Sequence, residues 1–136
     1  MSRAARVLFL ALVLAQACHS VEEYRNRLYD VLAPARYVSG LIAEDRRVGF
    51  VIFNAGLAAL GLWCFFGPIR RGRPSARAIA WAWAALEAAN GSVHILWSLA
   101  AGAYRPGLFT APVLLAIALV LARQLGRARA GAPTAA

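Results

Sequence analysis

Seven polar side chains of this chain have the types and the spacing that active sites use. They are His19, Glu22, Glu23, Asn54, Glu87, Asn90 and His94. The first three stand in the stretch "HSVEE" at separations of three and four residues, and the last three repeat those separations. Each group would therefore lie on one face of a helix. Imidazole and carboxylate groups that share a face in this way can bind a metal ion or transfer protons.

The metal-binding interpretation uses nitrogen and oxygen ligands only. The predicted ligands, from two helices of one bundle, are His19, Glu22, Glu23, Glu87 and His94. Such a set suits a divalent ion, namely zinc, iron or manganese, which would activate water as a Lewis acid. A carboxylate that is not a ligand, Glu22 or Glu23, would then act as general base, and Glu87 is a further candidate acid or base.

Two other interpretations of these residues stay open. Without a metal, Glu87 and His94 would transfer protons, while Asn90 orients the carbonyl or hydroxyl group of a small or lipid-like ligand. Asn54 and Asn90 are the candidate ligand-binding residues. In the non-catalytic alternative, the protein is a ligand-binding or assembly subunit whose polar residues are interhelical contacts. A hydrogen bond from Asn54 or Asn90 between membrane helices would contribute ~0.6 kcal/mol.

The elements that must position these residues are membrane helices. Of 136 residues, 61% are hydrophobic and 15% are charged, which is too apolar for an ordinary soluble domain. Four apolar segments each approach the ~20 residues that a helix needs to cross ~30 Å of hydrocarbon. They are residues 4–24, 48–66, 76–101 and 108–124. We therefore predict an all-α, integral membrane bundle of four transmembrane helices over residues 1–124, with a disordered tail at residues 125–136.

The distribution of arginine predicts the topology. The chain has no lysine, and its arginines outnumber its acids before the first span, between the second and third, and after the fourth. The connection between the first and second spans, counted from Glu22, instead balances five arginines with five acids, and the last loop holds Arg105 alone. By the positive-inside rule, both termini lie in the cytoplasm and the protein is a multi-pass protein of the cell (inner) membrane. The net charge of +9 is then explained by topology and anionic lipid, so the expected partner is the lipid bilayer and not nucleic acid.

The residues at the span ends predict where the helices stop. Gly67 and Pro68 are expected to end the second span, and Gly102 the third. Counting ~1.5 Å per residue from the middle of each span places His19 and His94 at one depth, each about 7 Å outward of its midpoint. We therefore expect a polar pocket, formed mainly by the first and third spans, in the outer half of the membrane.

The amino terminus allows a second interpretation. Arg3 and Arg6, the run "VLFLALVL" and the small residues Ala15 and Ala17 also fit a secretory signal peptide that is cleaved after Ala17. Otherwise the helix continues through Cys18 and His19. The chain would keep three spans after cleavage and four without it.

The motif and its surroundings resemble one protein family. "HSVEE" is an instance of the motif that names the HXXEE-domain proteins, small predicted four-helix membrane proteins, mostly bacterial, without established activity. The likeness continues through "FVIFNAG", "NGSVHILWSL" and "YRPGLFTAPVLL", and it covers about Leu10 to Leu121. The resemblance implies a shared fold and a polar site with an enzymatic or metal-binding role. It also argues against cleavage at Ala17, which would leave the motif on a frayed terminus.

Overall fold

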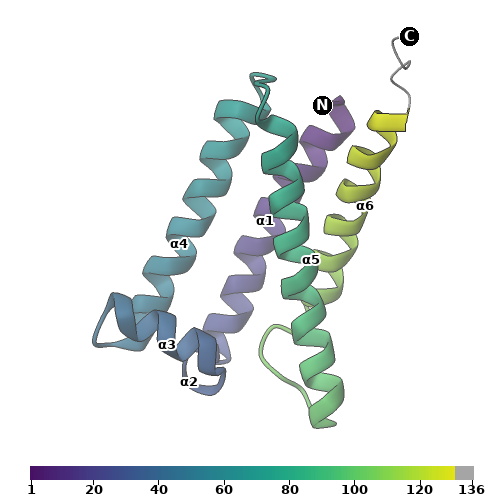
Figure 1. The fold of residues 1–136 in the computed structure, drawn as a ribbon. Coiled ribbons are helices and arrows are strands. Elements are labelled where there is room, and N and C mark those ends of the chain that lie inside the picture. The colour runs from purple at the N-terminus through teal and green to yellow at the C-terminus, as the bar shows by residue number, and fades with distance from the viewer. Residues whose placement is uncertain (131–136) are drawn as a thin grey trace.

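The regular structure of this protein is helical throughout the part of the chain that a computed structural model describes, residues 1–130 (Figure 1). Six α-helices and one π-helical turn follow one another. They are α1 Arg3–Arg25, α2 Leu28–Val31, α3 Ala33–Ile42, α4 Arg46–Cys64, the π-helical turn Phe65–Ile69, α5 Ala76–Ala101 and α6 Ala111–Ala130. The prediction of an all-α fold is confirmed.

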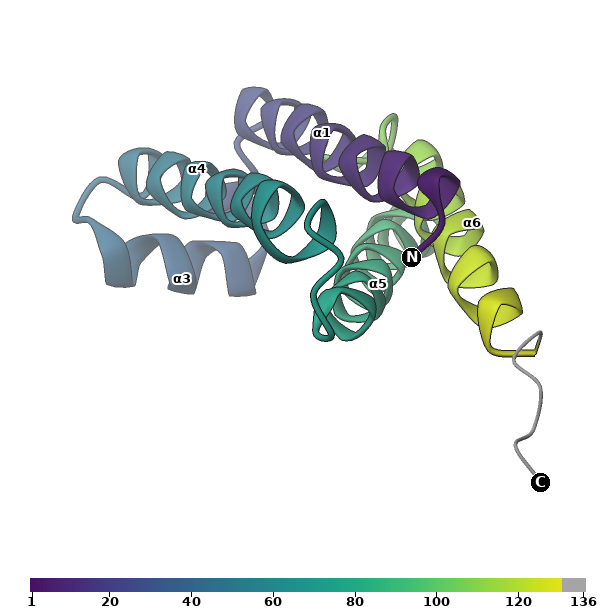
Figure 2. The same cartoon turned by 90° about the horizontal axis from the view of Figure 1, so that it is seen from above.

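The four long helices α1, α4, α5 and α6 run alongside one another, with α1 against α4 and α6, and α5 against α6 (Figures 1 and 2). The amino terminus, the α4–α5 connection and the end of α6 lie at one end of this bundle. Hydrogen bonds join these parts: Arg6 Nη1 donates to the Arg70 carbonyl at 3.4 Å, and Arg77 donates to the Leu125 carbonyl. The arginine-rich segments at the amino terminus, between α4 and α5, and in α6 therefore meet at the same end.

Two helical stretches are long and apolar enough to cross a membrane, Arg3–Arg25 and Arg46–Ile69. The first lies at the amino terminus, where signal sequences have the same properties. Within the described residues, α5 and α6 provide no further stretch of this kind. In α5 the polar residues Glu87, Asn90 and His94 reduce the hydropathy. The fold thus provides two candidate spans, and four spans remain a prediction.

The first connection is helical, where the sequence analysis assigned no element. Asn26 caps α1, and Arg27 then adopts a left-handed conformation with φ 57°, which turns the chain into α2 and α3. Leu28, Tyr29 and Phe50 pack into a small apolar cluster that holds this segment against α4. The apolar contacts explain why a connection rich in charged residues still folds.

Two helix ends differ from the predicted ones. Pro68 does not stop the second long helix, because the chain widens into the π-helical turn, which accommodates the missing backbone N–H, and continues to Ile69. Helix α6 continues to Ala130, so the first half of the predicted tail is helical, and residues 131–136 lie outside the described residues. Gly102 ends α5 with φ 59°, as predicted.

Helices α3 and α4 approach each other closely at Gly49. A Cβ atom built on Gly49 would lie 2.0 Å from the carbonyl oxygen of Ser39 on α3. On the same helix, a Cβ atom on Gly56 would meet nothing within 4 Å. The absence of a side chain at Gly49 therefore lets α3 lie against α4.

We predict opposite effects for alanine at these two glycines. Gly49→Ala should lower the free energy of unfolding by about 1–3 kcal/mol, because α3 must move away from α4. Gly56→Ala should raise it by about 0.5–1 kcal/mol, because alanine favours the helix and meets open space. Thermal unfolding of the two detergent-purified variants tests this, and equal midpoints would contradict the close approach.

Candidate metal centre

Three buried side chains from α1 and α5 converge on one point. Glu23 Oε1 lies 3.0 Å from His94 Nε2 and 3.4 Å from His19 Nε2. The two imidazole rings meet edge to face, with their centroids 4.8 Å apart. The exposed fractions are 0% for His19, 5% for Glu23 and 2% for His94. One ligand atom from each residue lies within 4.8 Å of the other two, so the three could hold one ion.

The connection between α5 and α6 folds back along α5 and fixes the orientation of both imidazoles (Figure 1). His94 Nδ1 lies 2.6 Å from the carbonyl oxygen of Pro106, which can only accept, so Nδ1 carries a proton and donates. His19 Nδ1 lies 2.7 Å from Thr110 Oγ1. The single hydroxyl proton of Thr110 is donated to Glu22 Oε2 at 2.6 Å, so this oxygen accepts from His19.

These hydrogen bonds leave Nε2 of each imidazole directed toward the same carboxylate oxygen. His19 Nε2 has no aligned hydrogen-bond partner among the described residues, although Glu23 Oε1 is 3.4 Å away. Neutral imidazoles and an ionised carboxylate would bring three lone pairs together in a buried place. Such an arrangement requires a cation between the three atoms, either a proton or a metal ion.

Gly107 lets the connection approach the imidazoles. Its φ is +94°, and a Cβ atom built on it would lie 2.6 Å from His94 Nδ1 and 2.9 Å from His19 Cε1. A larger residue at this position would collide with both rings. The glycine of "YRPG" is thus part of the wall of the site.

Glu22 faces away from the two histidines and holds the start of α6. Its carboxylate accepts hydrogen bonds from the backbone N–H groups of Phe109 and Thr110 at 3.1 and 2.9 Å, and from the Tyr104 hydroxyl at 2.8 Å. Burial and the hydrogen bond to this carboxylate raise the pKa of Tyr104 to about 12. The phenol therefore keeps the proton that it donates to Glu22 up to a higher pH than an ordinary tyrosine would.

A chain of side-chain hydrogen bonds joins α5, α1 and α4. Asn90 Nδ2 donates to Gln16 Oε1 at 3.2 Å, Gln16 Nε2 donates to Ser20 Oγ at 3.2 Å, and Ser20 Oγ donates to Asn54 Oδ1 at 2.8 Å. The Asn54 amide then donates to the Phe50 carbonyl at 3.0 Å. Both asparagines therefore act as interhelical contacts.

Glu87 lies apart from the three converging side chains. It is 1% exposed, and its Oε2 lies 3.4 Å from Asn90 Nδ2. Its Oε1 has no hydrogen-bond partner within the described part of the chain. Of the five residues predicted as metal ligands, the structure brings His19, Glu23 and His94 together, and places Glu22 and Glu87 elsewhere.

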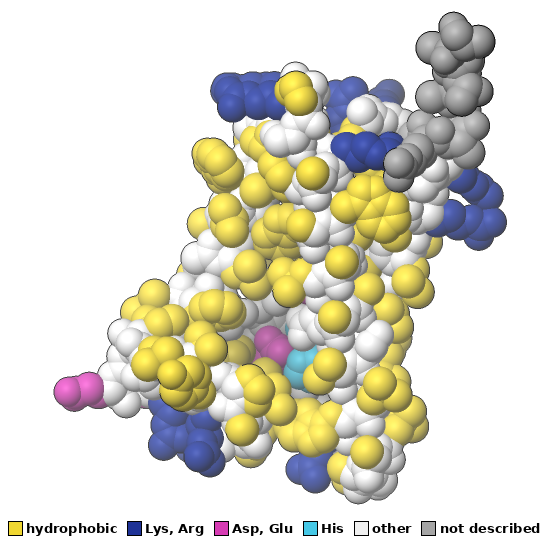
Figure 3. Space-filling model, in the orientation of Figure 1, with side chains coloured by type: hydrophobic (Ala, Val, Ile, Leu, Met, Phe, Trp, Pro, Cys, Tyr) yellow, Lys and Arg dark blue, Asp and Glu magenta, His cyan; other side chains and the backbone are white. Residues whose placement is uncertain are grey.

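A cavity of about 440 Å³ extends from Glu23 and His94 to the surface. Its lining also includes Asn54, Glu87 and Asn90, and its walls are otherwise mostly apolar. Figure 3 shows acidic and histidine atoms at the floor of a hollow between the α3–α4 pair and α5, surrounded by apolar side chains. The buried polar groups are thus accessible to a ligand through this cavity.

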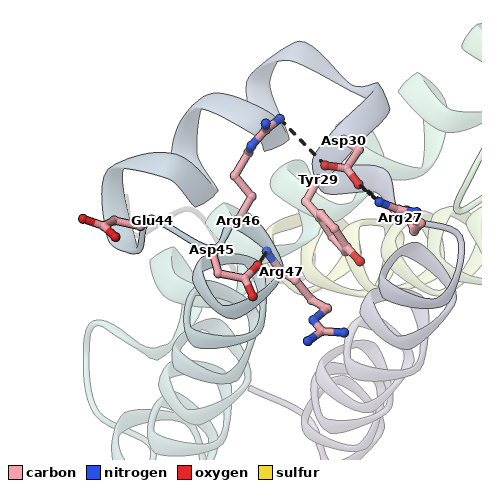
Figure 4. A pocket seen from close by; sticks show the side chains of 7 residues that line it. All are labelled: Arg27, Tyr29, Asp30, Glu44, Asp45, Arg46 and Arg47. Atoms are coloured by element: carbon pink, nitrogen blue, oxygen red, sulfur yellow. Dashed lines mark hydrogen bonds and ion pairs between the residues drawn. The ribbon is translucent and has the colours of Figure 1, made fainter.

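A second recess, at the end of the bundle formed by α2 and α3, is occupied by ion pairs. Figure 4 shows Asp30 between the guanidinium groups of Arg27 and Arg46, at 2.9 and 3.7 Å. Asp45 accepts from the Arg47 backbone N–H at 2.8 Å and caps α4. These opposite charges neutralise one another in contact with solvent. The Asp30–Arg46 ion pair links α2 to α4, and exposed pairs of this kind contribute little to stability.

The order and spacing of the polar residues match those of a known family. The family model described as "Protein of unknown function with HXXEE motif" matches residues 10–121. The chain belongs to the HXXEE family. Comparisons with curated proteins and with solved structures found no significant match.

The two glutamates of the HXXEE motif have different roles in this fold. Glu23, one helical turn after His19, contacts both imidazoles, whereas Glu22 binds the connection before α6. Sequence reasoning missed Pro106 and Thr110, which orient the histidines. Nothing in the stretch "YRPG" indicated that this connection folds back onto the HXXEE motif.

We predict that Gly107→Ala disturbs the site more than Gly102→Ala does. Both glycines have positive φ, so each alanine costs about 1–2 kcal/mol of backbone strain. Only at Gly107 does the added methyl group meet the imidazoles, which adds about 1–3 kcal/mol. Thermal unfolding of both variants, with NMR signals of the imidazole nitrogens, provides the comparison. Unchanged histidine signals in Gly107→Ala would argue against the close contact of the connection with the rings.

Proposed function

We propose that this HXXEE protein is an integral membrane protein of four transmembrane helices that holds one divalent metal ion between His19, Glu23 and His94. The proposed activity is enzymatic, on a small or lipid-like substrate that reaches the metal through the cavity. The transmembrane domain extends over residues 1–124.

The distribution of side chains supports four spans. All four long helices expose large apolar side chains on their outward faces, while the buried polar residues of α1 and α5, among them His19, Glu23 and His94, face inward. Examples, one from each of α1, α4, α5 and α6, are Leu14, Trp63, Leu96 and Val120. Arginines lie toward the two ends of the molecule, and apolar atoms cover most of the surface between them (Figure 3). Such a surface suits hydrocarbon, and would be unusual in water.

We propose that the end of the bundle with the amino terminus and the α4–α5 connection is cytoplasmic, so that both termini lie in the cytoplasm. The membrane is the cell (inner) membrane. Alkaline phosphatase should then be inactive when fused after Ala136 and active when fused after Gly102. The intact mass should show that residues 1–17 are not cleaved off. An active carboxyl-terminal fusion, or a mature chain that begins at Cys18, would contradict this topology.

One observation carries the metal proposal: the Nε2 atoms of two oriented imidazoles face one carboxylate oxygen, and one of them has no hydrogen-bond partner among the described residues. Ligands at ~2.0–2.1 Å from a tetrahedral zinc ion lie roughly 3.4 Å apart, close to the 3.0 and 3.4 Å between Glu23 and the imidazoles. Hydrogen bonds from Nδ1 to oxygen, as in His19 and His94, are typical of metal-binding histidines.

The donor set also suggests the chemistry. Two histidines and one carboxylate with a fourth position open are typical of catalytic zinc, and a related set binds iron(II). The metal would supply Lewis acidity beside the cavity. Glu87, which lines the cavity, is the candidate acid or base, and Asn90 contributes a polar group beside it. Glu22 would act on the metal indirectly, through Thr110 and His19.

We predict near-stoichiometric zinc, iron or manganese in the detergent-purified protein. His19→Ala, His94→Ala and Glu23→Gln should each lose the metal, because each removes one of three ligands. Glu22→Gln should weaken metal binding by about 10–100-fold without abolishing it, because Thr110 loses its charged acceptor. Elemental analysis of all variants at matched concentration provides the measurement.

Glu44→Gln is the control, because Glu44 is an exposed acid far from the histidines along the chain. It should retain the metal. Metal-free wild type, together with a His94→Ala variant that merely unfolds at lower temperature, would refute the metal centre. A proton would then bridge the three side chains, and the non-catalytic interpretation, in which these residues hold the bundle together, would be favoured.

A further inference from the structure

The cavity beside the three converging side chains has two chemically different parts. At about 440 Å³ it is within the ~300–1,000 Å³ of small-ligand pockets. Figure 3 shows its acidic and histidine atoms at the floor. The principal apolar residues of its walls are Leu32, Val38, Phe50, Phe53, Leu57 and Leu86. A ligand that fills it must be mostly hydrocarbon with one polar end.

The opening of the cavity faces the region that we assign to lipid. Phe53, Leu86 and Val93 line the cavity and are also 46%, 51% and 51% exposed. A cavity rimmed by exposed apolar side chains is more accessible from hydrocarbon than from water. A ligand dissolved in the bilayer could therefore enter sideways, between α4 and α5.

The floor offers one oxygen that the protein itself leaves without a partner. Asn54 and Gln16 are committed to the hydrogen bonds between helices, whereas Glu87 Oε1 has no partner among the described residues. An unpaired buried oxygen costs about 1–3 kcal/mol. A ligand O–H group that donates to Glu87 Oε1 would remove this cost and bring the polar end of the ligand beside Glu23 and His94.

We infer that the cavity binds a single-chain lipid, with its hydrocarbon chain along the α3–α4–α5 walls and its hydroxyl or protonated carboxyl group on Glu87 Oε1. The inference deepens the proposed function by naming the substrate class, and it rests on that function for the chemistry at the metal. At ~30 Å³ for each non-hydrogen atom the cavity holds roughly fifteen such atoms. A fatty acid, fatty alcohol or monoacylglycerol of moderate length fits this space, whereas a diacyl phospholipid is several times larger.

The test uses a medium-chain fatty acid with a photoreactive diazirine group, added to the full chain in lipid nanodiscs. Irradiation followed by peptide mapping should place the label on the lining segments of α3, α4 and α5. Val38→Trp, which fills the cavity, should reduce the label at least tenfold. Tyr37→Trp, at the neighbouring position on α3, should leave it unchanged, because Tyr37 is 69% exposed and is not part of this lining.

Variants of Glu87 test the polar contact. Glu87→Leu should weaken probe binding about tenfold, the effect of about one buried hydrogen bond. Glu87→Gln keeps an acceptor oxygen at this position and should bind the probe better than Glu87→Leu does. Equal binding to both variants and to the wild type would overturn the assignment of Glu87 as the partner of the polar group.

His19→Ala separates this inference from the proposed metal centre, because His19 is a proposed ligand that does not line the cavity. This variant should lose metal and keep the label. Absence of metal from every sample would refute the metal centre alone. Label spread evenly over the outward faces in all variants, or displaced by excess diacyl phospholipid as readily as by monoacylglycerol, would overturn the single-chain lipid site alone.

Discussion

The contact of one buried carboxylate with two buried imidazoles is the constraint on which the rest of the structure depends. Glu23 meets His19 from its own helix and His94 from α5, and all three are almost inaccessible to solvent. Charged and polar groups in such a place are stable only if each finds a partner or shares a cation. The register of α1 against α5 brings Glu23 to both imidazoles. The path of the α5–α6 connection supplies hydrogen-bond partners to the Nδ1 atoms of His19 and His94.

The α5–α6 connection links the two glutamates of the HXXEE motif. Consecutive residues on a helix point about 100° apart, so Glu22 and Glu23 point in different directions. Glu22 instead accepts four hydrogen bonds from the segment that precedes α6, and Thr110 in that segment binds His19. A carboxylate at the start of a helix is also favoured by the helix dipole. Glu22 thus anchors the start of α6 and, through Thr110, orients His19.

The molecule has an apolar exterior and a cavity with polar groups at its floor, and α3 forms part of the wall of this cavity. The helix is too short to cross a bilayer, yet it packs against α4 through the contact of Gly49 with Ser39 and adds an apolar wall to the cavity. A helix of ten residues thus adds a wall to the cavity. In a low dielectric, the few polar groups at its floor interact more strongly with one another and with a ligand than they would in water.

The sequence by itself determined the helical class and the faces on which His19, Glu23 and His94 lie, because these follow from composition and from a period of 3.6 residues. It also determined the family, through the HXXEE motif and the stretches that accompany it. Helical register also placed the two histidines at one depth, and their rings lie 4.8 Å apart. Only the tertiary structure decided which carboxylate joins them, since Glu22 and Glu23 differ by one position in a motif that fits either. Only the tertiary structure brought Pro106, Gly107 and Thr110 onto the imidazoles. A connection that folds back, and the backbone carbonyl that it supplies, leave no periodic pattern in a sequence. Helix faces are a local property of the chain, whereas the partner of a buried group depends on residues that are distant in sequence.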